Sequence, residues 1–211
     1  LDDNREWLAI RTLIREGKCD KPDHPVYYAG MIRGLTVTEW NEPKRTVLEA
    51  LEDDPELLED EVWGLFETER VGTDSLTGAE RWEGTDWSGA LIELSQQGRL
   101  SRDRLLDCSL SALNLGFNRE RSRWFLKFFD ALKPTEDEVS ERFEDLVVLL
   151  ESPTPNIVKW AFARCSRLYR KGLLADPEQL LELSSNLFLL PHKKPIADVL
   201  TFFERVATER P

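Results

Sequence analysis

A short helical motif that occurs twice constrains the fold of this chain more than any other feature. Each copy begins with a glycine and continues into a leucine-rich turn, and the copies cover residues 98–106 and 172–181. The two glycines lie 74 positions apart and the closing leucines 75 positions apart. Half of this spacing is about 37 residues, within the roughly 33 to 47 residues of one repeat in helical solenoids. The motif therefore predicts a stack of helix pairs.

Pro and Gly divide the rest of the chain into short segments whose apolar residues recur every three to four positions, as in amphipathic helices. No stretch alternates apolar and polar residues for long enough to predict a strand. Helices this short must bury their apolar stripes against neighbours, so we predict an all-α stack of antiparallel pairs with about ten helices. The expected helices cover residues 1–16, 25–33, 39–52, 55–66, 90–97, 103–115, 119–132, 136–151, 157–171, 177–190 and 195–208.

Several of these helices carry start signals in the sequence. Pro25 and Pro55 suit the first helical position, because a backbone N–H there would have no acceptor within the helix. Asp54 can cap the helix that Pro55 begins. Thr135 stands three residues before Glu138, the spacing of a capping box. These signals predict where the helices begin.

We predict a single helical-repeat domain over residues 1–211, with acidic helices in 1–70, an irregular loop in 71–88 and regular helix pairs in 89–211. The segment 71–88 loses helical periodicity and is rich in Gly, Asp, Thr and Ser, a loop composition of unusual length for a compact domain. Trp82 and Trp87 lie in this segment. They either anchor it on the helices or contact a partner.

The composition, with 41% hydrophobic and 32% charged residues, is sufficient for one sizeable or elongated core. No run approaches the roughly 18 apolar residues of a membrane span, and the first fifteen residues mix charges with apolar positions, unlike a signal peptide. We therefore expect a cytoplasmic protein without a membrane partner. Because the chain begins without Met and ends directly after a helical pattern, we expect it to be a piece of a longer protein.

Three stretches carry a resemblance to a known family: residues 54–67, residues 98–110, and residues 123–135 with their Arg-Trp-Phe and Ala-Leu-Lys-Pro-Thr sequences. They resemble an uncharacterised family of large bacterial helical-repeat proteins with a HEAT-like pattern. The resemblance implies a HEAT-like, right-handed superhelical stack in the N-terminal part of a larger protein. It implies no catalytic residue, because the family has no established chemistry.

The sequence contains none of the common catalytic or cofactor motifs. His24 and His192 have no second histidine at helical spacing, and no Gly-x-Ser-x-Gly, Cys-x-x-Cys or phosphate-binding Gly-rich loop occurs. Cys108 and Cys165 lie in apolar helical patterns, which indicates buried, inert thiols. We therefore predict no catalytic residues, no metal and no cofactor.

Residues 39–69 contain twelve acids against two bases. A cation site there would require carboxylates at the one-three-five spacing of a calcium loop with a central Gly, and this spacing is missing. A solvated acidic face is the expected explanation.

Formal charge alternates between the first and second helices of successive pairs. The expected first helices, 103–115, 136–151 and 176–190, carry −1, −6 and −3, whereas the second helices, 119–133, 157–171 and 193–208, carry +3, +5 and +1. Because second helices share one surface of a solenoid, the pattern predicts a basic surface opposite an acidic one. An alternative explanation is that oppositely charged neighbours attract each other and hold the stack in register.

We predict that this basic surface binds a partner, so that the protein acts as a non-catalytic interaction scaffold of a bacterial assembly. The expected partner is a protein, with an acidic segment as the matching chemistry. The alternative is a DNA-binding or DNA-repair protein that grips phosphates, which the net charge of −12 disfavours. The sequence carries no signal for the oligomeric state. The candidate partner-binding residues are Arg121, Arg123, Lys127, Lys159, Arg164, Arg167 and Lys171.

Overall fold

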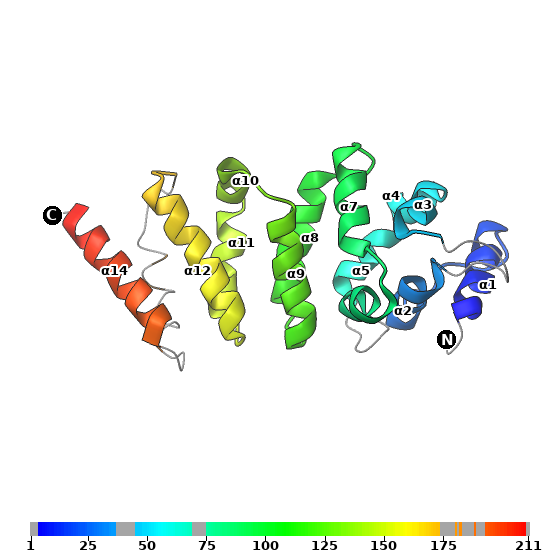
Figure 1. Cartoon of the computed structure of the whole chain (residues 1–211), viewed down its shortest axis with the longest axis horizontal. Coiled ribbons are helices and arrows are strands. Elements are labelled where there is room, and N and C mark those ends of the chain that lie inside the picture. Colours follow the sequence, from blue (N-terminus) through cyan, green and yellow to red (C-terminus); the bar gives the residue numbers. More distant parts are fainter. Residues whose placement is uncertain are drawn as a thin grey trace. The chain divides into compact units, whose positions relative to one another are not determined.

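The computed structural model of the chain describes residues 4–36, 45–68, 75–173, 180, 182, 188 and 193–209. Every regular element in these ranges is a helix, as predicted (Figure 1). The chain divides into two compact units, 1–108 and 109–211, where the sequence analysis predicted one domain. The boundary falls within α8 (Arg102–Asn114). We describe each unit separately, as unit 1 and unit 2.

Unit 1 consists of short helices whose starts follow the capping signals of the sequence. Asp54 accepts a hydrogen bond from the N–H of Leu57, and Pro55 is the first residue of α4, as predicted. Thr46 and Glu49 form a capping box at the start of α3. The elements are α1 (Asn4–Arg15), α2 (Pro25–Gly34), α3 (Val47–Glu52), α4 (Pro55–Glu59), a 3-10 turn (Glu61–Trp63), α5 (Gly64–Glu67), α6 (Leu76–Gly78), a π-helix (Ala79–Glu83) and α7 (Trp87–Gln96).

Residues 76–83 are helical, although they belong to the segment predicted to be an irregular loop. The hydroxyl of Ser75 accepts from the N–H of Gly78 and caps α6, and Gly84, at φ 68°, ends the π-helix. Ser75 and Gly84, two of the residues that suggest a loop, are therefore helix caps. Trp87 is fully buried and anchors this segment, whereas Trp82 is 55% exposed.

Unit 2 is built around the long helix α12, which packs against α9, α10 and α11. The expected helix 136–151 is interrupted at Arg142, whose backbone leaves the helical region. The guanidinium of this buried arginine donates to the carbonyl of Glu138, the acceptor that its own backbone N–H would use in a continuous helix. The capping box of Thr135 and Glu138 is confirmed. The elements are α9 (Arg119–Ala131), α10 (Glu136–Glu141), α11 (Phe143–Val148), a 3-10 turn (Leu149–Glu151), α12 (Pro155–Arg170) and α14 (Lys193–Glu209).

The repeated motif marks a helix end of one defined geometry. Gly98 and Gly172 adopt φ values of 73° and 72°, in the left-handed region that favours glycine. After α7, the N–H of Gly98 donates to Ser95 and that of Arg99 donates to Leu94; after α12, Gly172 and Leu173 make the same two bonds. This is the Schellman pattern, which satisfies the last helical carbonyls. The helix expected at 177–190 lies outside the described residues, apart from Leu180, Glu182 and Phe188.

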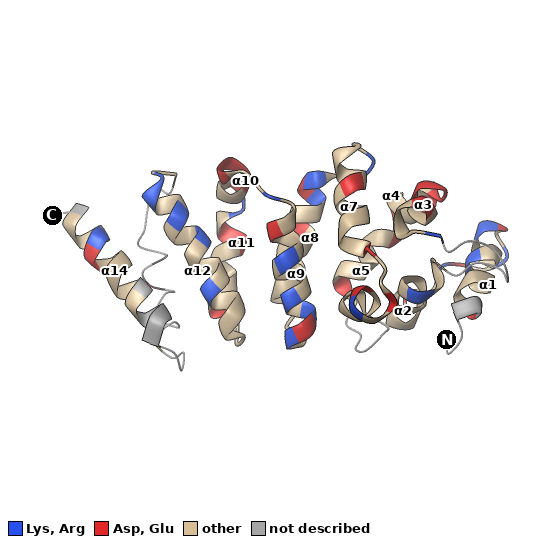
Figure 2. Cartoon of the chain, viewed as in Figure 1, with Lys and Arg blue, Asp and Glu red and all other residues tan. Residues whose placement is uncertain are grey.

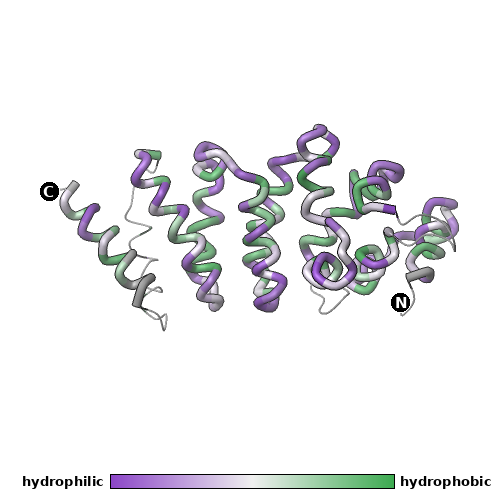
Figure 3. The backbone as a smooth tube through the Cα atoms, viewed as in Figure 1, coloured by the Kyte–Doolittle hydropathy of each residue, from purple (hydrophilic) through white to green (hydrophobic). Residues whose placement is uncertain are grey.

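Each unit buries its own apolar stripes, and hydrophobic and hydrophilic positions alternate along the helices (Figure 3). Among the described residues, no helix combines the length and the apolar character needed to cross a bilayer. The largest fully buried side chains are Trp7, Tyr27, Met31, Phe66 and Trp87 in unit 1, and Phe125, Phe128, Phe129 and Arg121 in unit 2.

Candidate anion-binding groove between α9 and α12

A groove of about 560 Å³ lies between α9 and α12 within unit 2. We call it the α9/α12 groove. α9 contributes basic side chains, one leucine and one carboxylate, and α12 contributes a lysine, a tryptophan and an asparagine. The lining residues are Arg119, Arg123, Leu126, Lys127, Asp130, Asn156, Lys159 and Trp160.

The position of α9 follows from its apolar stripe. Trp124, Phe125, Phe128 and Phe129 are buried, so the opposite side of the helix faces the groove and the solvent. Asn118 begins the helix by accepting hydrogen bonds from the N–H groups of the first turn. The amphipathic pattern alone therefore decides which α9 residues are accessible.

Four basic side chains of the groove keep their charge available. Arg119, Arg123 and Lys127 recur every four residues on α9, which aligns them along one helix face, and Lys159 lies across the groove on α12. The three α9 side chains are exposed, and Lys159 is half-buried. None of the four forms an ion pair with another residue of the described ranges. Figure 2 shows the basic positions along both helices.

The single carboxylate of the groove is already neutralised. Asp130 accepts a hydrogen bond of 3.2 Å from the indole Nε1 of Trp160 and pairs with Arg164. The guanidinium of Arg164 lies 3.6 Å from the centre of the Trp160 ring. Burial lowers the pKa of Arg164, and the charge of Asp130 opposes this effect. Asp130 and Trp160 form part of the groove wall, and the basic lining residues outnumber the one carboxylate, so the net charge presented to a ligand is positive.

Of the seven predicted partner-binding residues, Arg123, Lys127 and Lys159 line the groove. Arg121 does not, because it is only 1% exposed and lies 5.6 and 5.1 Å from the ring centres of Phe117 and Phe125. Arg121 stands four residues before Phe125, on the apolar stripe. Its assignment to the accessible surface was wrong because counting charges ignores the helical phase.

The predicted row of Arg164, Arg167 and Lys171 does not form a continuous basic face. Arg164 pairs with Asp130 of α9, and Arg167 pairs with Glu136 of α10. Only Lys171, at the end of α12, is exposed without an ion pair in the described part of the chain. Arg164 and Arg167 therefore fit the alternative explanation, in which opposite charges hold neighbouring helices together.

Sequence reasoning missed Arg119 and Trp160 as parts of the groove. The four-residue spacing from Arg119 to Arg123 and Lys127 is a signal that could have identified the first. Trp160 had no such signal, because its place depends on how α12 packs against α9.

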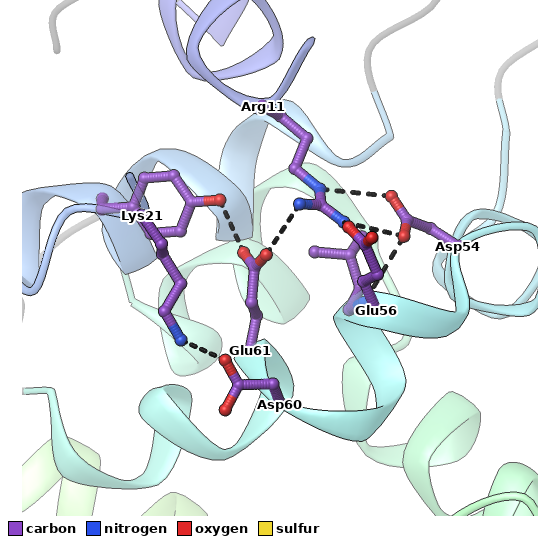
Figure 4. A network of polar contacts seen from close by, with 8 residues as sticks. Arg11, Lys21, Asp54, Glu56, Asp60 and Glu61 are labelled. Carbon is purple, nitrogen blue, oxygen red and sulfur yellow. Dashed lines mark hydrogen bonds and ion pairs between the residues drawn. The ribbon is translucent and has the colours of Figure 1, made fainter. Parts of the chain in front are cut away.

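A second polar cluster lies inside unit 1 (Figure 4). Arg11 on α1 is 4% exposed, and its guanidinium pairs with Asp54 at 2.8 Å, Glu56 at 2.9 Å and Glu61 at 2.9 Å. The hydroxyl of Tyr27 on α2 donates to Glu61 at 2.5 Å. The cluster joins α1, α2, α4 and the 3-10 turn, so its role is structural.

Most described acids of residues 39–69 are exposed, as the prediction of a solvated acidic face requires, and Glu61 is the one that is buried. Glu61 is 3% exposed, and burial raises its pKa, while its bond from Tyr27 and the charge of Arg11 oppose the rise. Burial also raises the pKa of Tyr27. Asp60 pairs with Lys21 beside the cluster. Within the described ranges, no group of three His, Cys, Asp or Glu side chains could hold a metal ion.

Cys108 is partly buried and Cys165 is buried, whereas Cys19 is exposed. Cys165 is buried, which raises the pKa of its thiol to about 12, and partial burial raises the pKa of Cys108. Burial therefore disfavours the reactive thiolate form of both side chains. The ring Nδ1 of His24 accepts from the N–H of Val26 and caps α2.

Comparison with known proteins identifies the family of the chain. No curated protein and no solved structure matches it. The model of a family described as a domain of unknown function, DUF6493, matches residues 6–191. This match covers most of the chain and both units. The chain therefore belongs to the DUF6493 family.

Proposed function

We propose that the protein is a non-catalytic interaction module whose α9/α12 groove binds an acidic segment of a partner protein. The observation that carries the proposal is the set of four basic side chains, Arg119, Arg123, Lys127 and Lys159, that converge on one groove without ion pairs in the described chain. In the wider proposal the helix pairs stack as a HEAT-like, right-handed superhelix, and the module serves a cytoplasmic bacterial assembly.

The energetics favour reversible binding. An exposed ion pair contributes about 0.2 to 1 kcal/mol, so four pairs supply about 1 to 4 kcal/mol. Charge alone therefore gives weak binding that depends on salt. Leu126 and the half-buried ring of Trp160 offer apolar contact beside the charges, which raises both affinity and specificity.

A nucleic-acid backbone is the second candidate, because Trp160 beside four cations resembles the combination that holds single strands. The charge balance favours the acidic protein segment instead. Unit 1 has 25 acids and 13 bases, a net charge of −12, and unit 2 has 15 of each. The net charge of −12 of the whole chain disfavours a long polyanion, whereas a short acidic segment needs only the groove.

Titration of the full chain with a fluorescently labelled acidic peptide, followed by anisotropy at low and high salt, tests the proposal. We expect binding that weakens as salt rises and that falls at least tenfold in the double variant Arg123→Glu, Lys127→Glu, since each reversal replaces an attraction by a repulsion. Lys171→Glu is the matched control, because Lys171 is exposed on the same unit but outside the groove. Absence of binding at low salt, or equal loss in the control, would reject the proposal. Tighter binding of a DNA strand with the same charge would favour the second candidate.

A further inference from the structure

A second pocket, of about 840 Å³, lies within unit 1 between α2, α3, the π-helix and the first two turns of α7. We call it the Trp82 pocket. The indole of Trp82 lines it together with five charged side chains, Arg33, Arg45, Glu83, Asp86 and Glu93, and the other lining residues are uncharged.

Trp82 presents its apolar surface to the solvent at this pocket. It is 55% exposed, more than any other large hydrophobic residue of the described ranges, whereas Trp87 is fully buried. Of the two roles that the sequence left open for these tryptophans, anchoring the segment fits Trp87 and contact with a partner fits Trp82.

The two cations that line the pocket already have partners. The Nε of Arg33 lies 3.8 Å from a carboxylate oxygen of Glu83. Arg45 pairs with Asp53 and donates a hydrogen bond of 3.2 Å to the backbone carbonyl of Glu49. Neither cation therefore brings an uncompensated positive charge to a ligand in the pocket.

Two carboxylates of the pocket, those of Asp86 and Glu93, are exposed and form no ion pair with the described residues. Asp86 accepts a hydrogen bond of 2.8 Å from the N–H of Gly89, and Glu93 accepts one of 3.4 Å from the amide of Gln97. Gly89 leaves room for the carboxylate of Asp86, because an added Cβ would overlap it. The charge that the pocket offers to a ligand is therefore negative.

The chain itself places a cation beside the indole of Trp82. The guanidinium of Arg81 lies 5.5 Å from the ring centre, within the range of a cation–π interaction. Arg81 does not line the pocket, so it does not cover the part of Trp82 that does. The net charge of −12 of unit 1 also attracts cations.

From these contacts we infer that the Trp82 pocket binds the basic side chain, arginine or lysine, of a partner segment. The cation contacts the indole of Trp82, and Asp86 and Glu93 balance its charge. The site lies in unit 1 and does not depend on the α9/α12 groove of unit 2. The inference therefore goes beyond the proposed function, which concerns an acidic ligand.

Titration of the ¹⁵N-labelled full chain with short unlabelled peptides, followed through the indole N–H signals in NMR spectra, tests the inference. Trp82→Phe identifies which of the seven indole signals belongs to Trp82. One peptide carries a central arginine, one a lysine, and one a citrulline, which resembles arginine without its charge. We expect the first two to shift the Trp82 signal in a saturable way. The citrulline peptide should bind at least about fivefold more weakly, because both the cation–π contact and the ion pairs require the charge.

The double variant Asp86→Asn, Glu93→Gln should weaken binding of the arginine peptide about tenfold, because each amide keeps an acceptor oxygen but loses the charge. The matched control is Glu59→Gln, Glu67→Gln, which removes two exposed carboxylates of unit 1 outside the pocket. It should change the affinity by less than about twofold. The dispersion of the NMR signals shows whether each variant is folded.

Three results would overturn the inference. One is equal affinity for the arginine and citrulline peptides, which would mean that the pocket does not recognise charge. Another is the absence of a saturable shift of the Trp82 signal at about 10 mM peptide. The third is an equal loss in the two double variants, because the attraction would then come from the net charge of unit 1 alone. None of these results bears on binding of an acidic peptide to the α9/α12 groove.

Discussion

The two units of this chain differ in net charge and in how their basic side chains pair with carboxylates. Unit 1 carries the whole net charge of −12, and four of its basic side chains, Arg11, Lys21, Arg45 and Arg99, pair with carboxylates, whereas the exposed Arg15 and Arg81 form no ion pair within the described ranges. Unit 2 has no net charge, yet four of its cations converge on a groove without ion pairs among the described residues. Net charge is therefore a poor guide to a binding surface. What matters is which charges the fold leaves without a neighbour of opposite sign.

Removal of the central cation of unit 1 should have the largest effect on stability. Arg11→Met leaves Glu61 and Asp54 without their partner in a buried position, and we expect a loss of about 3 to 5 kcal/mol in the free energy of unfolding. Urea denaturation at neutral pH measures it. The control Lys18→Met breaks only the exposed pair with Glu16 and should change stability by less than about 0.5 kcal/mol. A small effect for Arg11→Met would show that unit 1 does not depend on its buried pairs.

Two arginines of α9 that lie only two residues apart have different roles: Arg121 is buried in unit 2, and Arg123 is exposed in the groove. Arg121→Ala removes a buried side chain that lies beside the rings of Phe117 and Phe125, and we expect a loss of about 2 to 3 kcal/mol in the free energy of unfolding. Arg123→Ala should change stability by less than about 0.5 kcal/mol while weakening binding of an acidic peptide. Denaturation and anisotropy on the same samples measure both properties. Similar behaviour of the two variants would contradict the burial of Arg121.

The repeated glycines should behave alike although they lie in different units. Gly98→Ala and Gly172→Ala each force an alanine into the left-handed region, at about 1 to 2 kcal/mol. An added Cβ would meet no atom within 4 Å at either position, so the loss is purely conformational. Asn tolerates this conformation, and Gly98→Asn and Gly172→Asn should therefore lose clearly less. Thermal unfolding can rank the four variants, and a large difference between the two positions would contradict a shared role of the motif.

The smallest expected effect concerns the carboxylate of the groove. Asp130→Asn retains an acceptor for the indole of Trp160 but leaves Arg164 with its charge available. We expect binding of an acidic peptide to strengthen about two- to threefold, equivalent to about 0.5 kcal/mol. Asp145→Asn, which removes an exposed carboxylate from α11 outside the groove, is the matched control. Unchanged affinity in Asp130→Asn would indicate that Asp130 does not limit the potential of the groove.

Much of the helical fold could be predicted from local signals. Pro25, Asp54 with Pro55, and Thr135 with Glu138 begin helices as the sequence indicates, because a cap depends on residues within one turn. The interruption at Arg142 could not be predicted, since it depends on the burial of that side chain within unit 2. The helical turns at 76–83 were missed because Ser and Gly occur both in loops and at helix caps.

The sequence by itself determined that the chain is helical, where several helices begin, and which side of each is apolar, since these properties arise from interactions within a few residues. Only the tertiary structure decided which basic side chains are left without an ion pair in the described part of the chain. Arg164 and Arg167 are neutralised by residues 34 and 31 positions away, and Arg123 and Lys159 meet across a groove that exists only after α12 packs against α9. Coulombic interaction depends on distance in space, which the order of residues along the chain does not specify.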